Sequence, residues 1–404
     1  MDSKLNRNLP VLYAFSFFWL AMVIMPVLVP FFETRGLDLA EVFYLQSLFA
    51  AVVVLLEVPS GYVADVFGRK KALVAGAVFH GIGFTWLIWA EGFWELVLFE
   101  AILGVGLSLM SGADLSLLYD SQAAMNASHR DKARGIANLR VAKSLSEGTS
   151  ALIGGLLILH SFELTVLANA VFAWIPLGLA LLLVEAPFER MQRHTPVSNL
   201  KEVIRHLLME DRLLRLTCIN ITFFSLATFY VVWLLQPYWI GAGASLGWLG
   251  VLWAAQSFLF ALTCRVSLAL EERFGARLVL VVMGLLPVLG YWGMAATGGV
   301  LGILMSFLFF VSRGLNQVIL TDALNRRVPA KFRATANSMT SFAFRLVFIV
   351  TGPLLGMLVS EAGMTVALLV LGGVVVVMNL VFMWPLVAAI GEGADGQAAV
   401  STSG

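Results

Sequence analysis

The chain has 404 residues, of which 60% are hydrophobic and only 13% are charged, and its formal net charge at pH 7 is +1. A soluble protein of this length needs more charge to cover its surface. The composition therefore excludes an ordinary soluble enzyme and offers no basic surface for nucleic acid. Apolar runs long enough to cross about 30 Å of hydrocarbon recur along the sequence, which predicts an all-α polytopic membrane protein.

Twelve membrane-spanning helices are predicted, in two groups of six. Residues 8–32 and 216–264 contain no Asp, Glu, Lys or Arg, and the second run is broken at 241–247 by small residues. The predicted helices lie near 9–32, 41–64, 72–90, 94–120, 136–160, 163–184, 213–240, 246–270, 277–297, 299–324, 335–360 and 363–389. We therefore expect one six-helix bundle over residues 1–184 and a second over 213–390.

The longest polar stretch, residues 185–212, divides the helices six and six. Ser198 is placed to cap a short helix, and Val203, Ile204, Leu207 and Leu208 give that helix one apolar face. Such a segment suits a linker helix that lies on the membrane surface. The last residues, 391–404, have no apolar periodicity and are expected to be disordered.

The orientation follows from the placement of basic residues. One set of alternate loops carries Arg69, Lys70, Lys71, Arg130, Lys132, Arg134, Arg273, Arg277, Arg326, Arg327, Lys331 and Arg333. In the opposite set, Arg35 stands beside three acids. Because basic loops stay on the cytoplasmic side, both termini and the linker are predicted to face the cytoplasm.

A glycine-rich, charged turn follows the second predicted helix. Residues 61–73 read GYVADVFGRKKAL, with Gly61, Asp65, Gly68, Arg69 and Lys70 in order. Glycines permit a sharp turn, and an acid at a helix end can bond backbone donors or arginines. We expect these five residues to belong to a conformational gate, the alternative being a plain charged turn.

Two features of the first half recur in the second. Residues 65–70, DVFGRK, are matched by ERFGAR at 272–277. Asp120 and Arg134 are matched by Asp322 and Arg333 about 200 residues later, and these four residues extend the predicted gate. Two echoes with nearly one offset predict pseudo-symmetric halves in parallel repeat, with a substrate site at their interface.

The chain resembles the major facilitator superfamily of transporters over residues 9–389. The resemblance rests on LLEVPSGYVADVFGRKKAL (55–73) and on SGADLSLLYD (111–120), which look like the forms in bacterial drug or metabolite exporters. It implies the major facilitator fold, and for Asp65 a role in locking the two halves together on the cytoplasmic side. Two departures weaken an antiporter assignment: Glu100 stands where relatives often have arginine, and Gly352-Pro353 lies in helix 11 rather than helix 5.

Ionisable residues inside predicted helices are costly in a bilayer and usually face a water-filled cavity. Arg140, Lys143 and Glu147 share one face of the fifth helix. In a continuous fourth helix, Glu100 and Asp114 lie within about 40° of each other around the axis. A carboxylate there can take up a proton when water is excluded and release it when water or an arginine arrives. Glu147, Asp114 and Glu100 are the candidates for proton coupling; fixed ion pairs between helices are the alternative.

The substrate-binding candidates are the other charged, amide and aromatic residues at central positions. Arginines in the second half favour an anionic group, whereas aromatic side chains favour flat or amphipathic molecules. The alternative for each aromatic residue is ordinary helix packing. The candidates are Arg140, Lys143, Arg313, Asn316, Gln317, Arg345, Trp19, Phe224, Tyr230, Trp233, Trp253 and Gln256.

Other chemistries lack their motifs. The sequence has no phosphate-binding G-x-x-x-x-G-K-[ST] loop, its five histidines show no metal-ligand spacing, and its two cysteines lie in apolar segments. We therefore expect no enzyme, no cofactor and no metal. The hypothesis is a monomeric, proton-coupled exporter of an amphipathic small molecule in the cytoplasmic membrane. An importer or facilitator of an anionic metabolite is the alternative, and a membrane receptor without transport is the third.

Overall fold

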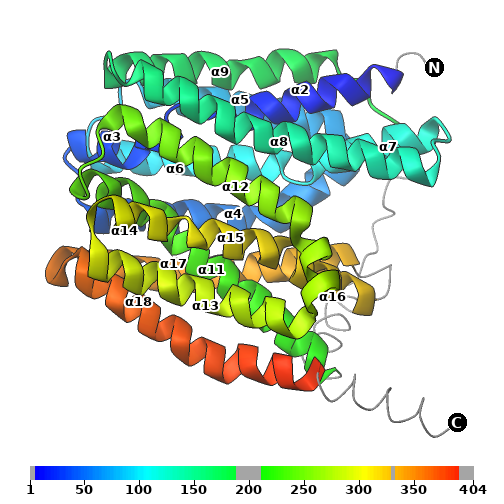
Figure 1. Ribbon diagram of the computed structural model, residues 1–404. Coiled ribbons are helices and arrows are strands. Elements are labelled where there is room, and N and C mark those ends of the chain that lie inside the picture. Colours follow the sequence, from blue (N-terminus) through cyan, green and yellow to red (C-terminus); the bar gives the residue numbers. More distant parts are fainter. Residues whose placement is uncertain (1–4, 188–210, 329–332, 391–404) are drawn as a thin grey trace, which may run out of the picture. The chain divides into compact units, whose positions relative to one another are not determined.

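The computed structural model describes residues 5–187, 211–328 and 333–390, and every regular element in these ranges is helical (Figure 1). The predicted linker with its surface helix, residues 185–212, lies largely outside these ranges, and the predicted disordered tail, residues 391–404, lies wholly outside them. The first half contains α2 (Asn8–Leu20), η1 (Met25–Val27), α3 (Leu28–Thr34), α4 (Leu39–Phe67), α5 (Arg69–Trp86), α6 (Phe93–Met110), α7 (Ala113–Ala124), α8 (His129–Leu157) and α9 (Phe162–Leu182).

The second half repeats the pattern of long helices. It contains α11 (Arg212–Gly241), α12 (Leu246–Phe274), α13 (Ala276–Thr297), α14 (Gly299–Ser306), α15 (Leu308–Leu315), the π-helical turn η3 (Asn316–Leu320), α16 (Thr321–Arg327), α17 (Arg333–Ala362), α18 (Met364–Met378) and the π-helical turn η5 (Asn379–Met383). The all-α, polytopic fold that the sequence predicts is therefore confirmed.

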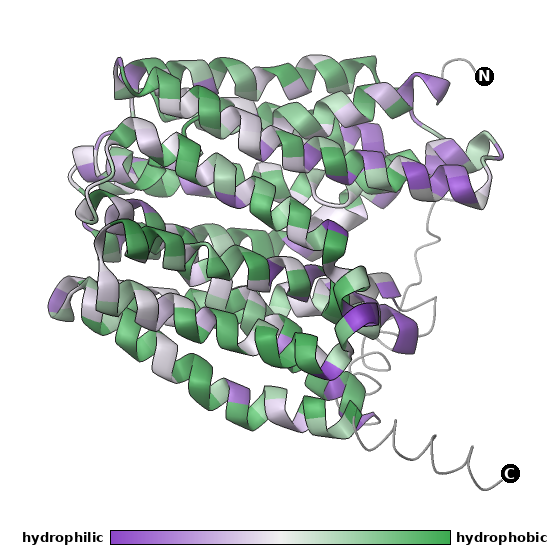
Figure 2. Cartoon of the chain, viewed as in Figure 1, coloured by the Kyte–Doolittle hydropathy of each residue, from purple (hydrophilic) through white to green (hydrophobic). Residues whose placement is uncertain are grey.

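Ten helical segments of the described chain are long and apolar enough to cross a membrane. α5 and α8, which correspond to the third and fifth predicted spans, are not among them. α5 begins with Arg69, Lys70 and Lys71, and α8 carries charges along its length. Hydrophobic residues cover most of the helices, and hydrophilic residues gather where α7 meets α8 (Figure 2). Large apolar side chains such as Trp94 (78% exposed) and Val300 (74% exposed) suit a surface that faces lipid.

Short polar side chains begin several of these helices. Asp38 and Glu41 form a capping box at the start of α4, where the Glu41 amide donates to Asp38 at 2.8 Å. Ser128 accepts from the Asp131 amide at the start of α8, and Ser161 accepts from the Leu164 amide at the start of α9. These caps satisfy amides that have no partner in the first helical turn, and so they fix where each helix begins.

The fourth and first predicted spans are not continuous. The helix predicted over 94–120 stops at Met110, and α7 starts at Ala113 after Gly112, whose φ is +82°. That left-handed conformation favours glycine, which explains the position of the break. The angle predicted between Glu100 and Asp114 assumed one straight helix, so that prediction is wrong. The helix predicted over 9–32 is likewise interrupted between Leu20 and Met25.

The chain divides into two compact units. The first unit comprises Met1–His194 with Ala244–Phe258, and the second comprises Thr195–Gly243 with Leu259–Gly404. In the first unit α5 packs against α6 and α9, and α2 packs against α8 (Figure 1). In the second, α13 packs against α14, α15 and α18, and α11 packs against α17. These are the same pairings by order along the chain, and the two halves therefore share one design. The domain boundaries at 184 and 213 stay a prediction.

A buried core in the first unit supports the polar residues described below. It joins side chains from α2, α5, α7 and α8, each with at most 2% of its surface exposed: Leu12, Phe15, Leu73, Leu117, Leu118 and Leu139.

In the second unit Pro287 removes the amide that would bond the Met283 carbonyl. Ser312 Oγ donates to that carbonyl at 2.9 Å and restores the lost hydrogen bond.

Candidate functional site

The break between α6 and α7 places a carboxylate inside the first unit. Asp114 lies in the first turn of α7 and is 1% exposed. Its Oδ1 accepts the Leu115 amide at 2.7 Å, and its Oδ2 accepts the hydroxyl of Ser16, from α2, at 3.1 Å. Backbone amides at a helix start favour negative charge, so the start of α7 is a suitable place for a carboxylate.

A lysine from α8 completes this site. Lys143 Nζ lies 2.6 Å from Asp114 Oδ2 and 5.0 Å from the centre of the Trp19 ring. Trp19 is 6% exposed, and its face supplies the negative side of the ring quadrupole to the ammonium. α2, α7 and α8 therefore meet around one ammonium, and we name Ser16, Trp19, Asp114 and Lys143 the Asp114 cluster. The residues Trp19, Asp114 and Lys143 were each predicted, for different roles.

The two charged members of the Asp114 cluster differ in access to solvent. The Asp114 side chain is 2% exposed, whereas the Lys143 side chain is 28% exposed. Removing one partner of a buried pair leaves an uncompensated charge, which costs several kcal/mol. A group that displaces Lys143 must therefore neutralise Asp114 itself, and a proton or a cation can do so.

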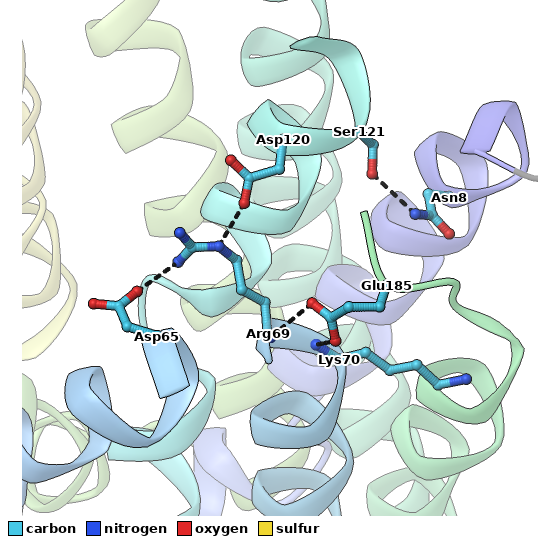
Figure 3. Close-up of polar contacts among 7 residues, drawn as sticks. All are labelled: Asn8, Asp65, Arg69, Lys70, Asp120, Ser121 and Glu185. Carbon is cyan, nitrogen blue, oxygen red and sulfur yellow. Dashed lines mark hydrogen bonds and ion pairs between the residues drawn. The ribbon is translucent and has the colours of Figure 1, made fainter. Parts of the chain in front are cut away.

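A second polar cluster surrounds the α4–α5 turn (Figure 3). Arg69, the first residue of α5, donates from Nη1 to Asp65 Oδ1 at 3.2 Å and from Nε to Asp120 Oδ2 at 2.5 Å. One guanidinium thus joins α4, α5 and α7 by charge-assisted hydrogen bonds. Lys70 donates to the Leu181 carbonyl at 3.0 Å, at the end of α9.

Glu185 ties the end of α9 to the same turn. Its carboxylate accepts the Arg69 amide at 2.9 Å and the Lys70 amide at 3.0 Å, so it caps α5 from 116 and 115 residues away (Figure 3). Gly68 has a φ of +109°, and a Cβ there would stand 2.6 Å from Glu185 Oε2. We name Asp65, Arg69, Asp120 and Glu185 the Arg69 clasp.

Asn8 extends the clasp to α2. Its side-chain amide donates to Ser121 Oγ at 2.9 Å (Figure 3). The same amide donates to the Val184 carbonyl at 2.7 Å, and the Asn8 side-chain oxygen accepts the Val184 amide at 2.9 Å. α2, α7 and the residues after α9 are thereby held at one end of the first unit. Close by, α2, α7 and α8 border a cavity of about 440 Å³ that Arg134 and Asn138 help to line.

The other residues predicted in the first unit belong to neither cluster. Glu100 is 3% exposed and accepts a hydrogen bond from Gln46 at 2.7 Å, between α6 and α4. Arg140 and Glu147 are exposed on α8, and Gly61 is exposed on α4. Trp253 and Gln256, on the part of α12 that belongs to this unit, are 8% and 1% exposed.

In the second unit the predicted binding residues cluster around α11. Asn316, in the π-helical turn, is 4% exposed and donates to Ser225 Oγ at 3.3 Å. Arg313 and Gln317 on either side of it are exposed. π-helical turns inside α-helices are frequent at functional sites, which singles out this segment. Arg313 lies over the Phe260 ring at 5.3 Å.

Aromatic side chains fill the space between α11 and α17. The Phe229 ring lies 4.7 Å from Phe348 and 6.3 Å from Trp233, and the Tyr230 hydroxyl is hydrogen-bonded to Thr351. Phe224, Tyr230 and Trp233 are all buried. These contacts join α11 to α17, and the substrate-binding role of the three residues stays a prediction. Arg345 donates to Ser341 Oγ at 2.7 Å, one turn before it on α17.

The predicted gate residues of the second unit pair locally. Asp322 lies 2.6 Å from Arg326 on the same helix, and Arg333 Nε donates to the Val328 carbonyl at 3.3 Å. Sequence reasoning missed Ser16, Asn8 and Glu185. Ser16 is one hydroxyl in an apolar helix and gives no signal, whereas Glu185 was assigned to the linker although it is the first acid after a long apolar run.

Helices that span the bilayer, polar clusters between them and two matching halves define a polytopic membrane transporter. The Major Facilitator Superfamily profile matches residues 11–351, and the chain belongs to that family. It is therefore a transporter and not an enzyme.

Similar proteins agree with this assignment. The multidrug resistance protein MdtH of Aeromonas salmonicida (strain A449) is 27% identical over 246 residues, which cover 57% of each chain. The chain thus matches little more than half the length of this curated relative. Among solved structures, the nucleoside transporter NupG has a TM-score of 0.76 at 15% identity and covers 94% of this chain and 99% of its own. A D-xylose–proton symporter has a TM-score of 0.72 at 16% identity, covering 93% of this chain and 96% of its own. At such identities the likeness shows the fold alone.

Proposed function

We propose that the chain exports an amphipathic small molecule in exchange for protons, by alternating access, in the bacterial cytoplasmic membrane. The observation that carries this proposal is the buried Asp114 carboxylate held by Lys143 at 2.6 Å. A carboxylate that is buried, yet paired with a partly exposed partner, can exchange that partner for a proton. The partial match to MdtH favours export.

Asp114 is the proton carrier in this proposal, ahead of Glu100 and Glu147. Glu100 is bonded to Gln46 and stands apart from the Asp114 cluster, while Glu147 is exposed. The Arg69 clasp acts as the gate element of the first unit, because it joins α4, α5, α7 and the end of α9 into one piece that can move together. Both termini face the cytoplasm, and the transporter works as a monomer.

Inside-out vesicles that accumulate ethidium under an imposed pH gradient test the proposal. Asp114→Asn should abolish accumulation, because an amide cannot carry the proton. Glu163→Gln, which removes an exposed carboxylate at the start of α9, is the matched control and should transport normally. Full accumulation by Asp114→Asn would contradict the proposal, and loss in Glu147→Gln or Glu100→Gln instead would move the proton site.

A second candidate function is uptake of an anionic metabolite. Within the described chain Arg313 makes no ion pair, and its guanidinium is exposed. An arginine at this depth is costly without a partner, and a substrate carboxylate or phosphate can supply one. Uptake of organic anions by cells that express the protein, lost in Arg313→Gln and kept in Asp114→Asn, would favour this function over export.

A further inference from the structure

The Asp114 cluster has the composition of a binding site for an organic cation. A carboxylate oxygen and an aromatic face converge on one ammonium, with Asp114 Oδ2 at 2.6 Å and the centre of the Trp19 ring at 5.0 Å from Lys143 Nζ. The Ser16 hydroxyl donates to the same Asp114 oxygen at 3.1 Å. Aromatic faces and carboxylates are the groups that proteins use to hold alkylammonium ligands. Here the chain's own lysine occupies the position.

The anionic part of this site is fixed and the cationic part is not. Asp114 stands at a helix start set by Gly112, and its other oxygen is held by the Leu115 amide. Lys143 reaches the site on a flexible four-carbon stem and keeps 28% of its side chain exposed. Lys143 can therefore leave while Asp114, Ser16 and Trp19 stay in place.

Other charged residues lie near Lys143 along the chain. On α8 they are Arg140 and Glu147, both exposed, three residues before and four residues after Lys143. Arg7, just before α2, donates to the Leu182 carbonyl, and on α7 the other acid is Asp120, bonded to Arg69.

We infer that Lys143 is a tethered occupant of a cation site formed by Asp114, Ser16 and Trp19, and that the exported substrate is an organic cation that displaces it. This inference rests on the proposed function and names its substrate class. Lys143 keeps Asp114 neutralised whenever neither a proton nor a substrate is bound. The lysine also sets a threshold for substrates, since only a cation that competes with a covalently attached ammonium is accepted.

Equilibrium binding to the purified full-length protein in detergent tests the inference. The probes are tetraphenylphosphonium and its anionic counterpart of the same shape, tetraphenylborate. Lys143→Met keeps the stem and removes the competing charge, so tetraphenylphosphonium should bind about tenfold more tightly or better. Lys143→Arg should bind it no more tightly than the wild type, and Asp114→Asn should not bind it. Lys132→Met removes another lysine that lies against a ring, that of Tyr119, and should change nothing.

The outcomes separate this inference from the proposed function. Unchanged or weaker phosphonium binding in a folded Lys143→Met overturns the tethered-occupant role. Tetraphenylborate binding that requires Lys143 shows instead that the lysine contacts an anionic substrate, which overturns it as well. If Lys143→Met does not fold, Lys143→Gln and the Asp114→Asn, Lys143→Met double variant take its place. The first should gain affinity and the second should show no phosphonium binding. If Asp114→Asn loses pH-driven transport but Lys143→Met gains no affinity for tetraphenylphosphonium, this inference is wrong and the proposed function stands.

Discussion

The glycine turns of the two units have the same backbone and different side-chain contacts. Gly68 has φ +109° and ψ 148°, and Gly275 has φ +83° and ψ 148°. After Gly68 comes Arg69, which reaches Asp120 on α7, whereas after Gly275 comes Ala276. Asp322, the counterpart of Asp120, therefore pairs with Arg326 along its own helix.

The glycine turn is the part of the repeat that both units share, and the side-chain contacts of Arg69 are specific to the first unit. Both units keep the turn that lets two long antiparallel helices meet. Within the described residues, the first unit contains both the Arg69 clasp and the Asp114 cluster. The first unit is therefore braced across helices at one end and contains the buried Asp114–Lys143 ion pair.

The two turn glycines give the sharpest comparison and the largest expected effect. Both positions have a backbone conformation that is essentially restricted to glycine, so Ala should cost about 1–3 kcal/mol at either. At Gly68 the new Cβ also meets Glu185 at 2.6 Å, whereas at Gly275 nothing lies within 4 Å. Gly68→Ala should therefore destabilise the protein by about 1 kcal/mol more than Gly275→Ala. Unfolding in mixed micelles measures both, and equal losses would contradict the Glu185 contact.

Removing the arginine of the clasp should have the next largest effect. Arg69→Gln leaves Asp65 and Asp120 facing each other without a shared partner, which should cost about 2 kcal/mol because the group is only 18% exposed. Transport should fall with it. Arg326→Gln breaks an exposed pair on one helix and should cost about 0.3–0.5 kcal/mol. A larger loss at Arg326 would mean that the second unit depends on its own pair.

The two helix caps offer a smaller contrast. Glu185 caps α5 from a distant segment, whereas Asp211 caps its own helix by accepting the Leu213 and Leu214 amides at 2.8 and 3.1 Å. Glu185→Gln and Asp211→Asn should each cost about 1 kcal/mol of stability. Transport should fall in Glu185→Gln alone, because that cap joins α9 to the gate. Equal transport by both variants would remove Glu185 from the gate.

An arginine placed directly after the second glycine turn, at the position that corresponds to Arg69, should give the smallest effect. Ala276→Arg places a guanidinium where Arg69 stands in the first unit, and we expect it to compete with Arg326 for Asp322. The gain in stability should be about 0.5 kcal/mol, and it should disappear in Ala276→Arg combined with Asp322→Asn. A gain that survives the double variant would show that the two turns do not correspond.

Much of the fold could be predicted from the sequence because the length of an apolar run is a local signal. The helices and the glycine turn with Asp65 and Arg69 all follow from runs and motifs. Glu185 could not be placed, because its hydrogen bonds join residues more than a hundred positions apart. The break at Ser111–Gly112 was missed because apolar residues resume soon after it, at Leu115.

The candidate site was predicted in pieces. Asp114, Lys143 and Trp19 were each selected for their charge or ring at membrane depth. Their meeting depends on the helix break and on how α2 packs against α8, and neither follows from the spacing within one helix. In the second unit Tyr230 and Trp233 lie in an aromatic layer with Phe229 and Phe348, and their binding role stays a prediction.

Proton movement in proteoliposomes tests the central claim most directly, that Asp114 exchanges a proton for substrate. A tetraphenylphosphonium gradient is imposed on vesicles that contain a trapped pH dye. The wild type should move protons against the flow of the cation, and Asp114→Asn should move none. Proton movement of undiminished size in folded Asp114→Asn vesicles would contradict the account.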